Sequence, residues 1–342
     1  RAFNNWGKLE QEYRTTDVLL KSLDFDFFEL LDSVTIARSR KHIEKYYDTA
    51  KIGKFPERKK PISLRPRLTD LNSAINYNQI YEQLSLLSLC IYTPSNYIFP
   101  SKVQKYMELT HNKGERLTQS GREEGIRRLM SINLLKRLES SVNSFCLTLK
   151  RMKSLIDSTI DSINRFEKYG NTEIGMYEVS DTELDMDDTN TDYFTVGKKV
   201  KIELSDMDYK TWRTELKNDA DTLELLTLMV EDITPEHDSK LQELLRLISD
   251  KIENPINNEN KKVLIFSAFS DTSEYLYDNV SKYIKKKYNL NTAVITGSID
   301  GKTTIKGFRS TLNNVLTCFS PVSKDREVLM PGSNEEIDIL IA

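Results

Sequence analysis

The C-terminal segment, residues 261–342, carries the pattern that most restricts the fold. Residues 262–267 (KVLIFS) are largely apolar and indicate a strand, and similar runs follow at 292–297 and 337–341. A helical pattern at Asp271–Tyr288 separates the first two runs. Apolar strands that alternate with helices are typical of parallel strands buried on both faces. The sequence therefore predicts the first part of an α/β domain here.

The preceding part of the chain shows apolar residues at helical spacing. The longest stripe begins near Thr118 and continues to Gly170, with a break expected around Ser140-Ser141. Helices in globular domains average about 11–12 residues, so a stripe of this length predicts a protruding hairpin or spur. Further helices are expected from about Ser205 to Pro255.

Composition narrows the class of protein. Charged residues make up 30% of the 342 residues, with only 12 Gly and 9 Pro, as expected for a helix-rich protein. No apolar run approaches the roughly 18 residues that a membrane span requires. Three widely spaced cysteines and three histidines exclude a disulfide framework and a Cys- or His-based metal site. We therefore expect a reducing, cytoplasmic setting and no membrane partner.

Charge is divided unevenly along the chain. Residues 1–170 contain 29 Lys and Arg against 20 Asp and Glu, whereas the remaining residues contain 20 against 32. A basic half and an acidic half are often found where one face meets nucleic acid. Solvated helix faces together with one acidic linker would give the same counts, so charge alone leaves both interpretations open.

Residues 297–303 (GSIDGKT) come close to a phosphate-binding P-loop, whose pattern is G-x-x-x-x-G-K-[ST]. The segment is one residue too short, and the P-loop depends on a specific nest of backbone N–H groups. We therefore expect an ordinary strand-to-helix turn, followed by a helical stretch at Thr304–Leu312. Nucleotide binding through Gly301-Lys302-Thr303 is the weaker alternative.

Ser267 lies at the carboxyl end of the first predicted strand, and Ser270 or Asp271 is a good N-cap for the helix that follows. In open α/β sheets, ligands bind outside this edge. A hydroxyl and the N–H groups of a helix start suit a phosphate of a nucleic-acid backbone. A core strand followed by an amphipathic helix explains the same residues equally well.

Residues 261–276 (KKVLIFSAFSDTSEYL) resemble the fourth conserved motif of superfamily-two helicases, particularly the Swi/Snf-type ATP-dependent translocases. Thr296-Gly297 with Phe308 resembles the strand, glycine and downstream phenylalanine that follow this motif. Residues 337–342 (IDILIA) look like the start of the fifth motif. The segments occur in the order that the family shows.

Upstream segments extend this resemblance over nearly the whole chain. Residues 34–41 (VTIARSRK) resemble the basic passage from the first motor lobe to the second, and 55–58 (FPER) resemble the proline-bearing crossing after it. Residues 130–145 (MSINLLKRLESSVNSF) look like the long helix before the second lobe in bacterial members.

The resemblance implies a mixed α and α/β fold, in which a large helical region precedes an incomplete RecA-like parallel sheet of the P-loop NTPase type. Residues 1–60 would be the end of lobe one and the crossing, and 61–170 a helical insertion. Residues 171–200 would be an acidic linker, 201–260 a helical segment, and 261–342 part of the second lobe.

The resemblance also implies a function, that of an ATP-dependent helicase or translocase that moves on nucleic acid. Double-stranded DNA is the expected track, and RNA remains an alternative. The chain contains neither a Walker-type phosphate loop nor the acidic Mg²⁺-binding motif, and phosphoryl transfer requires both. We therefore expect a fragment that lacks ATPase activity alone and works with a missing first lobe. ATP and Mg²⁺ would bind the parent protein, with no cofactor held tightly here.

The residues expected to contact nucleic acid come from the carboxyl ends of the predicted strands in the α/β segment and from two basic clusters. They are Ser267, Thr296, Gly297, Arg38, Arg40, Lys41, Lys136 and Arg137. The alternative for the basic residues is ordinary charge on helix surfaces. Arg127 and Arg128 have Glu123 and Glu124 at helical spacing, which favours ion pairs over nucleic-acid contacts.

A second function class remains open. The long apolar stripe and the acidic linker also suit a helical scaffold or protein-interaction module, in which the α/β segment is incidental. Affinity for nucleic acid at low salt distinguishes the two classes.

Overall fold

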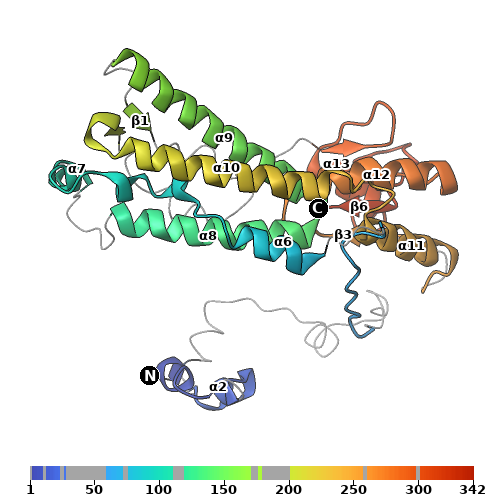
Figure 1. Ribbon diagram of the computed structural model, residues 1–342. Coiled ribbons are helices and arrows are strands. Elements are labelled where there is room, and N and C mark those ends of the chain that lie inside the picture. Colours follow the sequence, from blue (N-terminus) through green and yellow to red (C-terminus); the bar gives the residue numbers. More distant parts are fainter. Residues whose placement is uncertain are drawn as a thin grey trace. The chain divides into compact units, whose positions relative to one another are not determined.

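The computed structural model of the chain (Figure 1) divides into two units, Arg1–Leu64 and Arg65–Ala342. It describes residues 2–10, 13–23, 27, 59–71, 76–110, 119–170, 176–178, 201–256, 260–297 and 301–342. The predicted crossing between lobes, with Arg38, Arg40 and Lys41, lies outside the described residues. The finer domain boundaries expected from the sequence remain predictions.

The first unit contains two short helices in its described part, α1 (Ala2–Trp6) and α2 (Thr16–Lys21). The Trp6 indole Nε1 donates a hydrogen bond to the Thr15 carbonyl oxygen at 3.0 Å. This bond ties the end of α1 to the residue before α2.

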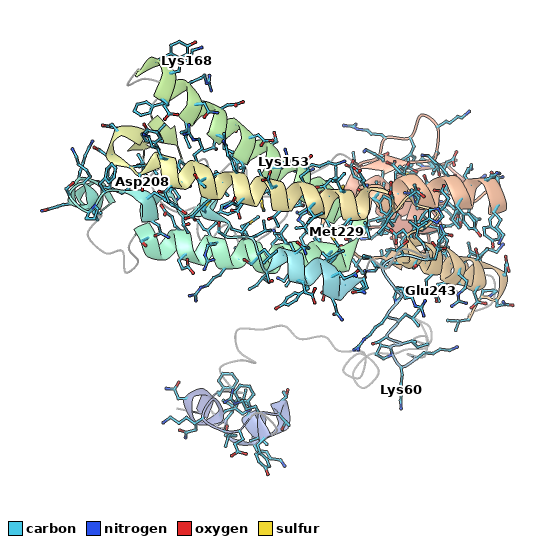
Figure 2. All side chains as sticks on the ribbon, in the orientation of Figure 1. Lys60, Lys153, Lys168, Asp208, Met229 and Glu243 are labelled. Atoms are coloured by element: carbon cyan, nitrogen blue, oxygen red, sulfur yellow. The ribbon has the colours of Figure 1, made fainter. Side chains whose placement is uncertain are left out.

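The second unit begins with a helical part, residues 65–233. Its helices are α6 (Tyr77–Leu84), η2 (Cys90–Tyr92), η3 (Pro94–Tyr97), α7 (Val103–Thr110), α8 (Gln119–Ser140), α9 (Val142–Tyr169) and α10 (Tyr209–Glu231). Asp208, which Figure 2 labels, directly precedes α10. Its carboxylate caps the helix by accepting a hydrogen bond from the Thr211 backbone N–H at 3.1 Å.

The long apolar stripe forms α8 and α9, and the predicted break is confirmed because Ser141 lies between them. The Ser141 side chain accepts a hydrogen bond from the Ser144 N–H at 3.0 Å, which starts a new helix. The chain turns back at this point (Figure 1), so the two helices form a hairpin. Both pack into one apolar core around the fully buried Trp212 of α10.

Only residues 176–178 of the predicted acidic linker, 171–200, are described. They form β1 (Met176–Glu178), which pairs in antiparallel fashion with β2 (Lys201–Glu203). The turn η6 (Leu204–Asp206) then leads from β2 toward α10.

The remainder of the second unit is the α/β part, residues 239–342. Its elements are α11 (Ser239–Glu253), β3 (Val263–Ile265), α12 (Ser270–Tyr288), β4 (Thr292–Val294), β5 (Lys302–Thr303), α13 (Leu312–Phe319), α14 (Arg326–Leu329) and β6 (Ile339–Ile341). The sheet order is β3-β6-β4-β5, and β3, β6 and β4 run parallel. The predicted parallel strands and the mixed α and α/β class are thereby confirmed.

The sheet is covered on two faces. On one face, Ile339 and Ile341 pack in a cluster with α11 and α12. On the other face, Leu340 packs in a cluster with α13. This alternation follows from the two-residue period of a strand. Leu264 of β3 is in register with Leu340 but is 45% exposed, so the predicted burial of both faces holds for β6 and fails for β3.

The region after β4 differs from the sequence prediction. Lys302–Thr303 form β5, which returns antiparallel to β4, so a hairpin replaces the predicted strand-to-helix turn. The helix expected at Thr304–Leu312 is absent, and α13 begins only at Leu312. A P-loop requires a helix directly after the loop, and Lys302 forms an ion pair with Glu274. Nucleotide binding through Gly301-Lys302-Thr303 therefore has no support in the geometry.

Candidate nucleic-acid interface

Three of the predicted site residues follow the carboxyl ends of parallel strands. Ser267 follows β3, Thr296 and Gly297 follow β4, and β6 lies between these two strands. The Ser267 backbone N–H donates to the Ala342 carbonyl oxygen at 2.8 Å, which continues the ladder to the edge. Parallel strands place their carboxyl ends at one edge of a sheet, and this edge is called the rim below.

The Ser267 hydroxyl is tied into its own loop. It donates to the Phe269 carbonyl oxygen at 3.2 Å and accepts from the Phe269 N–H at 3.2 Å. A hydroxyl has a single proton, so Ser267 has to rotate before it donates to a phosphate. The predicted phosphate contact is therefore weaker in this conformation than the sequence suggested.

Gly297 is exposed and keeps an ordinary backbone conformation. A Cβ atom built there would meet no atom within 4 Å, so the fold places no demand for glycine at this position. Thr296 is half-buried beside it. These two residues reach the rim, as the sequence predicted.

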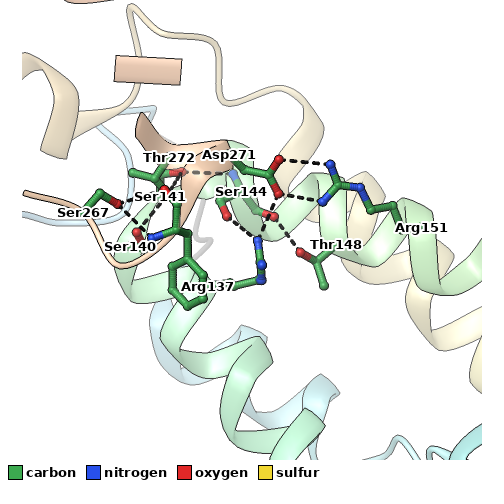
Figure 3. Close-up of polar contacts among 10 residues, drawn as sticks. Arg137, Ser140, Ser141, Ser144, Thr148, Arg151, Ser267, Asp271 and Thr272 are labelled. Atoms are coloured by element: carbon green, nitrogen blue, oxygen red, sulfur yellow. Dashed lines mark hydrogen bonds and ion pairs between the residues drawn. The ribbon is translucent and has the colours of Figure 1, made fainter. Parts of the chain in front are cut away.

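Arg137 departs from its predicted role at the surface, since its side chain is fully buried. The Nη1 atom donates to the Asp271 carboxylate at 3.0 Å and to the Ser144 hydroxyl at 2.9 Å (Figure 3). The guanidinium carbon also lies 4.3 Å from the centroid of the Phe269 ring, a cation–π contact. Arg137 thus joins α8 to the start of α12, and a nucleic acid at the surface could not reach it.

Arg151 of α9 binds the same carboxylate. Its Nη1 and Nη2 atoms donate to the two Asp271 oxygens at 2.6 and 3.0 Å (Figure 3). Burial alone would raise the pKa of Asp271, but Arg151 and then Arg137 more than offset this and hold the pKa below its usual value. Sequence reasoning missed Arg151 because no local spacing links it to Asp271.

Hydroxyl and ammonium groups extend this network around the break between α8 and α9. The Ser140 hydroxyl lies 2.8 Å from the Thr272 hydroxyl (Figure 3). The Lys240 ammonium donates to the carbonyl oxygens of Glu139 and Ser140 at 2.6 and 3.0 Å. Because carbonyls at a helix C-terminus carry partial negative charge, Lys240 stabilises the end of α8.

A cleft of about 610 Å³ opens beside this network. One wall is the turn between α8 and α9, another is the start of α11, and the third is the rim with the start of α12. Its lining residues are Lys136, Glu139, Ser140, Ser141, Asp238, Lys240, Leu241, Leu244, Ile265, Phe266, Ser267, Ala268, Phe269, Thr272, Tyr275 and Leu276. The predicted residues Lys136 and Ser267 therefore line one cleft.

The titratable groups of the cleft show two opposite effects of burial. Burial lowers the pKa of Lys240, although Asp238 and Glu139 act to raise it. Burial and then the Asp238 carboxylate raise the pKa of Tyr275, whose hydroxyl donates to Asp238 at 3.0 Å. Asp238 also caps α11 through the N–H groups of Lys240 and Leu241.

The ion pairs expected for Arg127 and Arg128 are confirmed. Both donate to Glu124, at 2.7 Å from Arg127 Nη2 and 3.1 Å from Arg128 Nε. Hydrogen bonds from Arg127 and then Arg128 lower the pKa of Glu124 to about 2. In contrast, the exposed Lys136 forms no ion pair or hydrogen bond with any described residue.

Other site chemistries find no support in the part of the chain that the structure covers. There, His, Cys, Asp and Glu side chains form no group that could hold a metal ion. Cys90, Cys146 and Cys318 are free thiols. Among those same residues, each helix is too short or too polar to cross a bilayer.

Comparison with known proteins identifies no relative. No family model matches the sequence, and neither a curated protein nor a solved structure is significantly similar to it.

Proposed function

We propose that this chain is part of a Swi/Snf-type, ATP-dependent helicase or translocase, and that its rim contacts nucleic acid. In this proposal the α/β part, residues 239–342, belongs to a RecA-like second motor lobe. The helical part, residues 65–233, is an insertion that supports the rim. ATP and Mg²⁺ bind where this lobe meets a first motor lobe.

The observation that carries the proposal is the position of the motif-like segments in the sheet. Ser267 and Thr296-Gly297 follow β3 and β4, the two parallel neighbours of β6. Segments far apart in the sequence thus end at a single edge, where ligands bind in open α/β sheets. Residues 337–342, the third motif-like segment, contain β6 itself.

The cleft beside the rim adds support from charge. Lys136 lines it without an ion-pair partner among the described residues. A lysine in this setting is available for a phosphate contact. The contribution from charge is modest, because Glu139 and Asp238 line the same cleft.

A DNA titration of the 342-residue chain tests the proposal. We expect binding to a labelled DNA of about 20 nucleotides or base pairs at 50 mM salt, and weaker binding at 200 mM, because phosphate contacts release counterions. The longer protein that also contains a first lobe should show ATPase activity that DNA stimulates. An absence of DNA binding at low salt and of stimulation would refute the proposal.

The second candidate function is a helical scaffold that binds a protein partner. Leu225 and Leu228 lie three residues apart on α10 and are 46% and 55% exposed, whereas Leu223 and Leu226 of the same helix are buried in the core. Residues three apart share one helix face, so this pair presents an apolar surface. Tight binding of a defined protein partner that Leu225→Ser and Leu228→Ser abolish, without DNA affinity, would favour this function.

A further inference from the structure

The cleft beside the rim lies where the topology of the sheet favours a ligand. The connection that leaves β3 runs through α12 on one face, and the connection from β4 to β6 runs through α13 on the other. The connections that follow the carboxyl ends of β3 and β4 thus lie on opposite faces of the sheet, and β6 lies between these two strands. Ligands commonly bind outside the carboxyl ends of parallel strands in such sheets, and the cleft lies at the carboxyl end of β3.

Phe266 gives this cleft an aromatic surface. The residue directly follows β3 and lines the cleft, yet it is 77% exposed. Single exposed apolar residues are common on protein surfaces and require no explanation by themselves. Here, however, Phe266 and Ser267 line the same cleft, whose volume of about 610 Å³ is large enough for a base and its sugar.

Lys136 supplies the charge that complements this ring. Among the basic residues of the second half of α8, Arg137 is engaged with Asp271, whereas Lys136 is exposed on the cleft and unpaired within the described chain. The Glu139 and Asp238 carboxylates weaken any purely electrostatic attraction of a free anion. The site therefore suits a ligand that combines an aromatic ring with one phosphate.

We propose that the cleft binds one unpaired nucleotide of a nucleic-acid strand, with its base stacked on Phe266 and a neighbouring phosphate next to Lys136. This inference rests on the proposed function, since it takes the track to be nucleic acid. It adds that the chain engages a single strand or an extruded base. Extruding a base from a duplex costs a few kcal/mol, so single-stranded DNA should bind more tightly than duplex at this site.

The test uses the full 342-residue chain and single-stranded oligothymidylate with one central 2-aminopurine. Stacking of a base on an aromatic side chain is worth about 1–3 kcal/mol, so Phe266→Ala should weaken binding by about five- to 150-fold. The 2-aminopurine fluorescence should rise on binding to the wild type, as the base leaves its neighbours, and should rise less with the variant. Phe266→Leu keeps the apolar contact without the aromatic ring and should resemble Phe266→Ala.

Two further variants complete the design. Lys136→Gln should reduce the dependence of log Kd on log salt by about the share of one phosphate contact, near 0.7 for a single strand. Val322→Ala is the matched control, because Val322 is a 91% exposed apolar residue of the α/β part that does not line this cleft. Phe266 is exposed, so its replacement should leave the circular dichroism spectrum and the melting temperature unchanged.

The outcomes separate this inference from the proposed function. Wild-type protein that binds neither single-stranded nor duplex DNA contradicts both. If the wild type and Phe266→Ala bind single-stranded DNA with equal affinity, the inference is overturned and the proposed function stands. The same holds if the wild type prefers duplex DNA and gives no change in 2-aminopurine fluorescence. A loss of single-strand binding in Phe266→Ala, with Val322→Ala unaffected, supports both.

Discussion

At the scale of single residues, one carboxylate joins two arginines at the junction between the helical part and the α/β part. Asp271 accepts hydrogen bonds from Arg137, which is fully buried, and from Arg151, whose side chain is 56% exposed. A buried charge without its partner is far more costly than an exposed one. The two arginines therefore contribute unequally to the free energy of unfolding, although both form short hydrogen bonds with Asp271.

Replacement of Asp271 by Asn should destabilise the protein by about 3 kcal/mol, because it removes the negative charge beside the buried Arg137 guanidinium. Arg151→Gln removes only the exposed partner and should cost less than about 1 kcal/mol. Urea denaturation followed by circular dichroism measures both values. Equal costs for the two variants would show that burial does not set the strength of this network.

The same carboxylate predicts a dependence of stability on pH. The pKa of Asp271 in the folded protein lies below its ordinary value of 3.8. A carboxyl group with a lowered pKa contributes stability that is fully present above the unfolded-state pKa and is lost as pH falls through the folded-state pKa. The difference in unfolding free energy between wild type and Asp271→Asn should thus be constant from pH 7 to about pH 5 and shrink below about pH 4. A difference that grows in acid would contradict this assignment.

At the scale of elements, the hairpin of β4 and β5 places a strict demand on one glycine. A Cβ atom at Gly301 would lie 2.2 Å from the Ser310 carbonyl oxygen, whereas a Cβ at Gly297 would meet nothing within 4 Å. The two glycines flank the same segment, which the sequence presented as one phosphate-binding pattern. Their roles differ because only Gly301 lies against another backbone.

We therefore expect Gly301→Ala to destabilise the protein by about 1–3 kcal/mol, since the Ser310 backbone has to move to admit a methyl group. Gly297→Ala should leave the melting temperature nearly unchanged, and it serves as the matched control. Differential scanning calorimetry of the two variants and the wild type gives the comparison. A stable Gly301→Ala protein would mean that the Ser310 loop yields at little cost.

The elements that the sequence predicted correctly are those with strong local patterns. The break at Ser141 was predictable because two adjacent serines interrupt a long apolar stripe, and a serine is a good N-cap. The parallel strands β3, β4 and β6 were predictable from their apolar runs. The order of the strands in the sheet was not predictable, because local patterns carry no information on which strands become neighbours.

The sequence predictions were wrong where contacts between distant residues determine the structure. Arg137 has the sequence context of a surface arginine, but its carboxylate partner lies 134 residues away, and this pairing buries it. The segment after β4 forms a hairpin because β5 gains a ladder with β4, which outweighs the weak helical preference expected at Thr304–Leu312. The cleft that Phe266 lines forms where three elements distant in the sequence pack together. No local sequence pattern therefore predicts it.

At the scale of the whole second unit, the helical part and the α/β part have separate apolar clusters. The helical part contains one cluster of buried apolar residues, from Leu68 to Val230, and the α/β part contains the two clusters on the faces of the sheet. The contacts between the parts that are described above are polar, around Asp271, Thr272 and Lys240. Parts with separate cores and a polar junction are expected to open independently.

A pair of core substitutions tests this independence. Leu149 and Ile284 are both fully buried, the first in the helical cluster and the second in the cluster between the sheet and α12. Replacement of either by Ala should cost about 2–5 kcal/mol, through lost burial and the cavity left behind. In hydrogen-exchange mass spectrometry, Leu149→Ala should speed exchange in α8, α9 and α10 while β6 and α13 keep their protection. Ile284→Ala should give the reverse pattern. If each variant instead speeds exchange equally in both parts, the polar junction couples them into a single cooperative unit, and the Asp271 network is then the first candidate for that coupling.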